Sequence, residues 1–239
     1  MSVNVMLVPD MAALRYGHNR ITDVGGILMF NTSQLPLRGW SPFIKRCEDL
    51  LLAGAGLLLL SPIMLVTAIA IKLDSKGPVL FRQKRYGYND NLIRVFKFRS
   101  MYVDQTDFNA ECQTTRSDPR ITRVGRIIRK TSIDELPQLF NVLLGNMSMV
   151  GPRPHATATK AAGIPFEEAV SEYSSRHRVK PGITGWAQIN GYRGETDTLF
   201  KIQKRVEYDL EYIAKWSVWF DLYIVFMTVP AVLSTKEVY

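Results

Sequence analysis

Two adjacent carboxylates, Asp134 and Glu135, are the residues best suited to chemistry, and they lie in the run Thr131–Gln138 (TSIDELPQ). Several cations stand upstream of the pair, at Arg120, Arg123, Arg126, Arg129 and Lys130. Acids beside so many cations predict a positively charged pocket that handles an anion. Neighbouring side chains on a helix point about 100° apart. The two carboxylates therefore divide the work, because one can attack while the other holds a metal.

The local sequence predicts that a helix begins beside this pair. Ser132 and Glu135 have the S-x-x-E spacing of a capping box, which marks a helix start. Pro137 would lie slightly too deep if Ser132 were the N-cap, so we expect the start near Ile133 or Asp134. The carboxylates then lie at the positive end of a helix, where backbone N–H groups can receive a phosphate. The same pair is also common as a plain capping feature.

Arg153 is a candidate for binding phosphate, because it stands between two prolines in Gly151–Pro154 (GPRP). So fixed, it loses little freedom on binding and can present a bidentate guanidinium. Strand alternation over Leu92–Met101 places Lys97 and Arg99 on one face. That face is either a plain solvated surface or a second cationic surface beside the acidic pair.

The turn-rich loop Lys180–Gly194 is expected to be structured. Its Trp186, Gln188 and Arg193 could contact a base or a sugar, although Trp186 suits simple packing equally well.

Composition restricts the class of protein and its partners. The chain has 239 residues, 46% of them hydrophobic, which suits one domain with a real core and room for a partial second. Its net charge of +8 suits anionic lipid headgroups, nucleotide phosphates or nucleic acid, and charge alone does not choose among them. Cys47 and Cys112 are isolated, which indicates a reducing, cytosolic compartment without a structural zinc.

The segment Leu50–Leu73 is apolar and nearly free of charge. A straight helix of this length would span roughly 36 Å, enough for a hydrocarbon core of about 30 Å. Ser61 and Pro62 interrupt it near its middle. Pro62 removes a backbone donor and Ser61 can bond back to the preceding turn, so we expect a kink or a reversal there.

Positive charge flanks this segment on both sides, at Arg38, Lys45 and Arg46 before it and at Lys72, Lys76, Arg82, Lys84 and Arg85 after it. Both ends therefore prefer the cytoplasm under the positive-inside rule. A re-entrant helix-break-helix wedge that enters one leaflet and returns satisfies both ends. A kinked span and a buried soluble helix are the alternatives.

The remaining pattern predicts a mixed α/β fold that is mostly α-helical. We expect a β-hairpin from Val79–Gln83 and Leu92–Met101 around a turn at 87–91, and short strands at 3–8 and 26–30. Residues 103–119 are expected to form a helix and a loop. Helices are expected over Phe166–Arg178 and Lys201–Ala214, and an interfacial amphipathic helix over Trp216–Met227. Helical spacing from Ile121 to Leu144 predicts core positions at Val124, Ile127, Ile128, Leu136, Leu139, Phe140 and Leu143.

Several motifs in fixed order resemble the bacterial sugar transferases, the monotopic phosphoglycosyl transferases. They are Ser61-Pro62, Phe81-Arg82-Gln83, Lys97–Met101, Asp118–Thr122, Thr131–Gln138, Gly151–Pro154 and Pro181–Gln188. The resemblance covers residues 41–239, the expected membrane-associated catalytic domain. Residues 1–40 resemble only the last strands of the N-terminal soluble module that larger members carry.

The resemblance implies transfer of a sugar 1-phosphate from a UDP-sugar to undecaprenyl phosphate, with Mg²⁺ and release of UMP. By position, Asp134 is the nucleophile that forms a phosphosugar intermediate. Glu135 is its partner and, with Asp134, a metal ligand, while Arg153 binds phosphate. Further substrate contacts are expected at Lys97, Arg99, Arg82, Arg120, Gln138, Trp186 and Gln188. Ser61 and Pro62 return the helix to the cytoplasmic face of the bacterial inner membrane. Membrane lipids are therefore expected partners of the chain.

The C-terminal runs Asn190–Leu199 and Arg205–Leu210 resemble the subgroup that acts on UDP-glucose. UDP-galactose or an N-acetylated amino sugar is the alternative donor, and a homodimer is compatible with the resemblance. Two rivals belong to other classes. One is a membrane scaffold for glycan assembly without turnover, and the other is a basic nucleic-acid binder, which no recognised motif supports.

Overall fold

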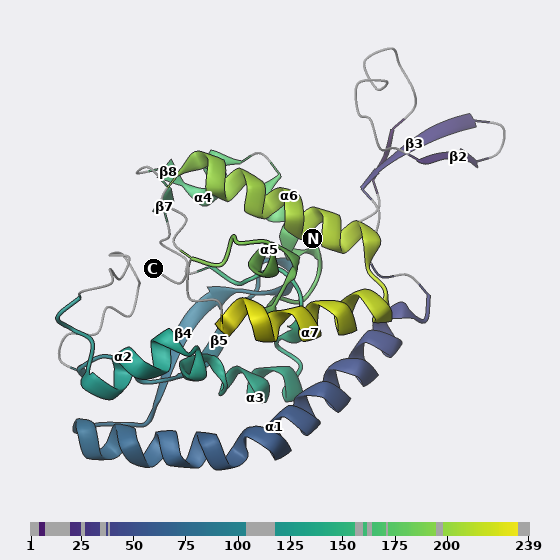
Figure 1. The fold of residues 1–239 in the computed structure, drawn as a ribbon. Coiled ribbons are helices and arrows are strands. Elements are labelled where there is room, and N and C mark those ends of the chain that lie inside the picture. The colour runs from purple at the N-terminus through teal and green to yellow at the C-terminus, as the bar shows by residue number, and fades with distance from the viewer. Residues whose placement is uncertain are drawn as a thin grey trace.

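The computed structural model describes residues 5–7, 20–24, 27–33, 37, 39–103, 118–155, 160–161, 164–170, 172–194 and 198–233. Within these residues the fold is mixed α/β and mostly helical, as the sequence predicts. A long bent helix, α1, runs along one side of the molecule, and the other helices and a two-stranded hairpin are arranged beside it (Figure 1).

Helix α1 (Ser41–Asp74) is the apolar segment, extended by nine charged or mixed residues at its N-terminal end. Its most apolar stretch has a mean hydropathy of 2.3, and only 17% of that stretch is buried. Leu51, Leu58 and Leu73 are among its most exposed side chains. By length and composition it is the one helix in the described part of the chain that could cross a membrane. The predicted apolar membrane-compatible helix is therefore confirmed.

The Ser61–Pro62 pair lies inside α1 without dividing it into two elements. Ser61 Oγ donates to Leu58 O at 3.0 Å, the back-bonding expected beside a proline that removes a donor. Figure 1 shows α1 bent along its length. The bent helix is a structural fact, and its re-entrant path in a membrane stays a prediction.

Strands β4 (Leu80–Tyr86) and β5 (Leu92–Phe98) form the predicted antiparallel hairpin. The short helix η2 (Tyr88–Asp90) makes the turn, with φ of 53° at Asn89 and 60° at Asp90. Asn and Asp tolerate this left-handed region better than most residues.

Three short helices follow the hairpin: α2 (Arg123–Lys130), η4 (Ile133–Glu135) and α3 (Gln138–Leu143). Thr122 caps α2 by accepting from Gly125 N at 2.9 Å. The break between α2 and η4 includes Ser132, whose φ is 57°.

The predicted core positions of this region are only partly correct. Ile128 and Leu139 are buried, but Ile127, Phe140 and Leu143 are 64%, 41% and 36% exposed. Helical spacing detects an apolar face without indicating whether that face meets a core or a bilayer.

A parallel pair joins β6 (Ser148–Val150) to β9 (Gly182–Thr184). A Cβ on Gly182 would lie 2.1 Å from the backbone N of Gly151, closer than real atoms approach. The glycines of two separate motifs are therefore required by one close backbone contact.

The predicted helix over Phe166–Arg178 is wrong as a single element. The chain forms α4 (Phe166–Ala169) and then η5 (Tyr173–Arg178), separated by Val170 with extended dihedrals of −138° and 117°. Short strands β7 (Lys160–Ala161) and β8 (Ile164–Pro165) pair just before it. The break lets Tyr173 and Arg176 both point into the core.

The C-terminal part holds α5 (Trp186–Ile189), α6 (Leu199–Lys215) and α7 (Val218–Leu233). Helices α6 and α7 confirm the two predicted there. On α7, Trp219 and Phe226 are 81% and 75% exposed while Asp221 is fully buried. An exposed aromatic face on a short apolar helix suits the headgroup region.

Near the N-terminus, β1 (Val5–Leu7), β2 (Arg20–Val24) and β3 (Ile27–Ser33) form an antiparallel sheet in the order β1-β3-β2. The predicted strands at 3–8 and 26–30 overlap β1 and β3, and β2 was missed. The helix predicted after residue 103 falls on 104–117, outside the described residues.

Candidate active site

The acidic pair lies on η4, which begins at Ile133 as the sequence predicts. The capping-box prediction is wrong, because Ser132 adopts a left-handed conformation and its side chain makes no capping bond. Its hydroxyl accepts from Arg193 instead. The Glu135 side chain is therefore not committed to the helix end, and it turns towards cations.

Glu135 is held by two cations from distant parts of the chain. Lys97 Nζ donates to Oε1 at 2.8 Å, and the Arg153 guanidinium donates to both oxygens, at 2.5 and 3.0 Å. The Glu135 side chain is 11% exposed. Ion pairs in so buried a setting are short and directional, and the bidentate fork fixes the plane of the carboxylate.

Asp134 differs from its neighbour although it stands one residue away. No hydrogen bond or ion pair within the described part of the chain reaches its carboxylate, which is half-buried. Burial raises the pKa of Asp134 to about 6, the negative charge of Glu135 adds to the rise, and Lys97 opposes it. Burial also opposes ionisation of Glu135, but Arg153 and Lys97 hold the pKa of that carboxyl well below its usual range.

The two acids thus differ in their pKa and in their ion-pair partners. Glu135 is ionised and fixed by cations. Asp134 has no ion-pair partner among the described residues and its pKa is raised to about 6, so it can act as a nucleophile or as a proton-transfer group.

The backbone around Arg153 is fixed by three separate elements. Pro152 O accepts from Gly182 N at 3.0 Å, Arg153 O accepts from Arg176 Nη2 at 2.7 Å, and Pro154 O accepts from Arg85 Nη1 at 2.6 Å. Three successive carbonyls are therefore held, which fixes the backbone that carries the Arg153 side chain.

Helix α6 supports this segment from behind. Asp209 Oδ2 accepts from Arg176 at 2.6 and 3.0 Å, and both side chains are almost completely buried. Arg205, also on α6, donates to the backbone of Tyr192 at 2.8 Å. The same helix thus positions both the Arg153 segment and the turn-rich loop.

Three of the arginines expected at the substrate contact other parts of the chain. Arg99 is buried and donates to Lys76 O and Ser75 O at 2.6 and 2.7 Å, closing the C-terminal end of α1. Arg82 lies over the Phe96 ring at 5.3 Å. The remaining one, Arg120, forms a fork with Asp118.

The other side chains that were expected to contact substrate are Trp186, Gln188 and Gln138, and the first two have partners within the protein. Trp186 Nε1 donates to Glu211 at 2.9 Å, and its ring packs edge-on against Phe220. Gln188 donates to Ile183 O at 3.3 Å while its buried Oε1 has no partner among the described residues. Gln138 is buried at the first residue of α3.

Sequence reasoning missed the supporting arginines. Arg85 was counted only as a flanking charge, yet burial and the nearby Arg153 lower its pKa to about 10. It shares a strand face with Gln83, whose Oε1 it contacts at 2.7 Å. The i, i+2 spacing was the available signal. Arg176 gave none, because it lies in a stretch expected to be a plain amphipathic helix.

The chain matches the family model described as "Bacterial sugar transferase" over residues 40–235. It is 51% identical over 236 residues to the UDP-glucose:undecaprenyl-phosphate glucose-1-phosphate transferase of Escherichia coli (strain K12), covering 99% of this chain and 50% of that relative. It is 55% identical over 204 residues to the undecaprenyl-phosphate glucose phosphotransferase of Komagataeibacter xylinus, with coverage of 85% and 38%.

The name of a further relative gives a different sugar donor. The UDP-N-acetylgalactosamine-undecaprenyl-phosphate N-acetylgalactosaminephosphotransferase of Aeromonas hydrophila is 44% identical over 193 residues, with coverage of 80% of this chain and 44% of the relative. The chain spans half or less of the length of these curated relatives.

Proposed function

This chain belongs to the bacterial sugar transferase family, and on that premise we propose that it transfers a sugar 1-phosphate from a UDP-sugar to undecaprenyl phosphate, releasing UMP. The observation that carries the proposal is the unpaired Asp134 carboxylate beside a Glu135 that Lys97 and Arg153 hold. The reaction would start assembly of an exopolysaccharide, capsule or O-antigen at the cytoplasmic face of the bacterial inner membrane.

Asp134 is the proposed nucleophile. Its carboxylate oxygen forms a bond to the phosphorus that carries the sugar, and the bridging P–O bond of the pyrophosphate breaks with its electrons leaving on UMP. A phosphate oxygen of undecaprenyl phosphate then attacks the same phosphorus and releases the Asp134 carboxylate. Splitting one displacement into two lets a water-soluble donor and a lipid acceptor use the site in turn.

Lys97 and Arg153 are the proposed phosphate-side groups. An anionic carboxylate approaching an anionic pyrophosphate needs cations to stabilise the charge that develops in the transition state. Both cations already contact Glu135, so they are positioned before substrate arrives.

The acidic pair fits a magnesium ion whose coordination shell is completed by substrate. Among the described residues no three His, Cys, Asp or Glu side chains gather to form an all-protein site. Mg²⁺ is commonly held by one or two carboxylates plus phosphates. Among the described residues, no side chain contacts the Asp134 oxygens by a hydrogen bond or ion pair, and Oε2 of Glu135 accepts from Arg153 alone. These two residues would hold the ion, which when bound would neutralise charge on the pyrophosphate.

Glucose is the proposed sugar, because the relatives of highest identity among those described above are named for glucose transfer. Galactose or an N-acetylated amino sugar is the alternative, supported by the relative named for N-acetylgalactosamine. We place residues 41–239 in one membrane-associated catalytic domain and treat residues 1–40 as a separate N-terminal segment, because the family match begins at residue 40.

The test supplies purified protein with undecaprenyl phosphate, Mg²⁺ and a panel of UDP-sugars, and measures UMP. UDP-glucose should give the highest rate, and Asp134→Asn should abolish release. Glu207→Gln, which removes an exposed acid on α6, is the matched control and should keep the rate. Release by Asp134→Asn at the control rate would favour another nucleophile, and silence with every donor would favour the scaffold reading.

A further inference from the structure

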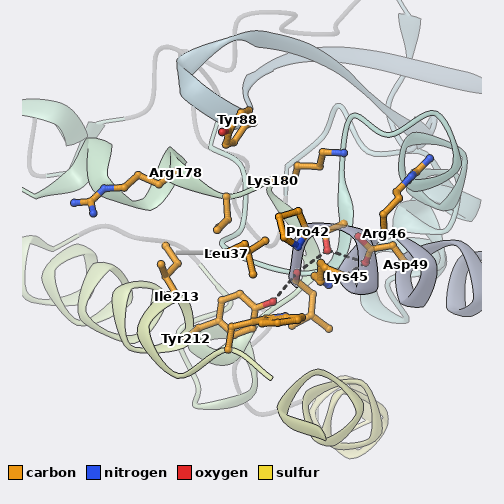
Figure 2. A pocket seen from close by; sticks show the side chains of 14 residues that line it. Leu37, Pro42, Lys45, Arg46, Asp49, Tyr88, Arg178, Lys180, Tyr212 and Ile213 are labelled. Carbon is orange, nitrogen blue, oxygen red and sulfur yellow. Dashed lines mark hydrogen bonds and ion pairs between the residues drawn. The ribbon is translucent and has the colours of Figure 1, made fainter. Parts of the chain in front are cut away.

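A cavity of about 200 Å³ lies against the first turns of α1, between β6 and the junction of α6 with α7 (Figure 2). Its described lining includes neither Asp134 nor Glu135, and neither Lys97 nor Arg153. It is therefore a separate site from the acidic cluster.

Two cations reach the same part of this cavity. Figure 2 shows the charged ends of Lys180 and Arg46 extending to the same side of the pocket, while the Arg178 guanidinium points to the other side. A Cβ built on Gly145 would lie 3.5 Å from Arg46 Nη2 and 3.8 Å from Lys180 Nζ. Both positive groups thus share the space over the C-terminal end of α3, where Arg46 donates to Val142 O at 2.6 Å.

The acidic side chain of the cavity forms its ion pair with another residue, Lys45, and not with these two cations. Asp49 is the one carboxylate in the described lining, and its Oδ1 already accepts from Lys45, Ser148 and Met149 at 2.8 to 2.9 Å. Lys45 is itself paired with Asp221 at 2.7 Å. Lys180 makes no hydrogen bond or ion pair to the described residues. Arg46 donates to the carbonyl oxygens of Val142 and Leu143 at 2.6 and 2.8 Å, so neither cation is paired with a carboxylate of the described residues.

The charges around Lys180 favour the binding of an anion. Burial lowers the pKa of Lys180, the positive charges of Arg46 and Lys45 lower it further, and the negative charge of Asp49 opposes them in part. A bound anion would reverse these effects, because opposite charge favours the protonated amine.

Apolar side chains also line the cavity, among them Val150, Val179, Ile213 and Trp216. A ligand that fills the cavity therefore carries both an anion and hydrocarbon. The position agrees with this chemistry: the long apolar part of α1 starts directly after Asp49, and Trp216 stands before α7, where tryptophan marks a membrane interface. The cavity would lie at headgroup depth when α1 is inserted.

We propose that this cavity binds the phosphodiester headgroup of an anionic glycerophospholipid, with Lys180 and Arg46 on the phosphate oxygens and the acyl-side carbons against Val179, Ile213 and Trp216. The site goes beyond the proposed transfer reaction. It ties the N-terminal end of α1 to bulk lipid, and the acceptor phosphate uses the Asp134 site instead.

The test titrates the full chain in detergent with dihexanoyl phosphatidylglycerol below its micelle concentration, followed by calorimetry. Wild-type protein should bind a single equivalent. Lys180→Gln should weaken binding about tenfold or more, because a charge-assisted hydrogen bond is lost. Lys180→Arg should keep it. Lys84→Gln, an exposed lysine of β4 outside the cavity, is the matched control and should bind as wild type does.

A second variant guards against a folding defect. Leu37→Trp enlarges an apolar side chain of the cavity lining, and it should weaken binding to a similar degree while thermal melting stays unchanged. Equal binding by Lys180→Gln and Lys84→Gln would overturn the proposal in favour of general attraction to a positive protein. Inorganic phosphate binding as tightly as the lipid would indicate a free-phosphate site.

A competition experiment with farnesyl phosphate, an analogue of the lipid acceptor, separates this proposal from the transfer reaction. Farnesyl phosphate should leave phosphatidylglycerol binding unchanged, and Lys180→Gln should retain UMP release. Displacement of the lipid by farnesyl phosphate, together with loss of transfer in Lys180→Gln, would show that the cavity holds the acceptor and would contradict the proposal.

Discussion

Arg176 donates from Nη2 to the backbone oxygen of Arg153 at 2.7 Å while the same guanidinium is paired with Asp209 on α6. A buried ion pair between η5 and α6 therefore sets the position of an arginine that holds Glu135. The pair couples the stability of the fold to the geometry of the candidate site, and this coupling can be measured.

Asp209→Ala should destabilise the protein by about 3 to 5 kcal/mol, because it leaves the buried Arg176 without its counter-charge. Thermal melting of the full chain measures this. Glu207→Ala on the same helix removes an exposed partner of Lys204, and should cost no more than about 1 kcal/mol. Equal melting temperatures for the two variants would mean that Arg176 is not held as described.

The first half-reaction should depend on pH through Asp134. Since the attacking group must be ionised and its pKa is about 6, UMP release in a single turnover should be full above that pH. It should fall roughly tenfold per pH unit below it. Omitting undecaprenyl phosphate removes the titration of the acceptor from the profile.

Two variants test whether the midpoint of this pH profile belongs to Asp134. Glu135→Gln removes a charge that raises the pKa of Asp134, so the midpoint should move below 6. Lys97→Met removes a charge that lowers it, so the midpoint should move upward. Profiles that stay where the wild type lies would assign the titration to another group.

Gly182→Ala should destabilise the β6–β9 pair by about 1 to 3 kcal/mol or more, because its Cβ would collide with backbone rather than with a movable side chain. The nearest atoms are Gly151 N at 2.1 Å and Thr184 O at 2.4 Å. Denaturant unfolding checks this. Gly54→Ala, on α1 with nothing within 4 Å of the added carbon, is the control and should not destabilise.

Removal of residues 1–36 should leave UMP release close to that of the full chain, because β1, β2 and β3 pair with one another and the family match begins at residue 40. Removal of residues 1–46 deletes the buried Lys45 and its pairs with Asp49 and Asp221, and should prevent folding. Loss of activity in the shorter deletion would assign residues 1–36 to the catalytic unit.

The sequence predicted the site best where residues of separate motifs also meet in the folded structure. Asp134, Glu135, Lys97 and Arg153 were each identified, and three of them meet in one cluster. Arg99 was expected beside Lys97 because side chains alternate along a strand. Strand β5 ends at Phe98, so alternation no longer applies, and Arg99 turns to the end of α1.

Other misses have physical reasons of the same kind. The exposed Ile127 and Phe140 were assigned to the core because apolar spacing does not distinguish protein from lipid. Arg176 was invisible because its role depends on Asp209, which lies 33 residues along the chain. Pairings across such distances follow from the fold, and a single sequence does not display them.

The most direct test of the central claim is to incubate the full chain with UDP-glucose labelled in the sugar, without undecaprenyl phosphate, and to measure label on the denatured polypeptide. The account predicts labelled wild-type protein, no label on Asp134→Asn, and discharge of the label when undecaprenyl phosphate is added. Accumulation of lipid-linked sugar phosphate while the polypeptide never carries label would contradict it.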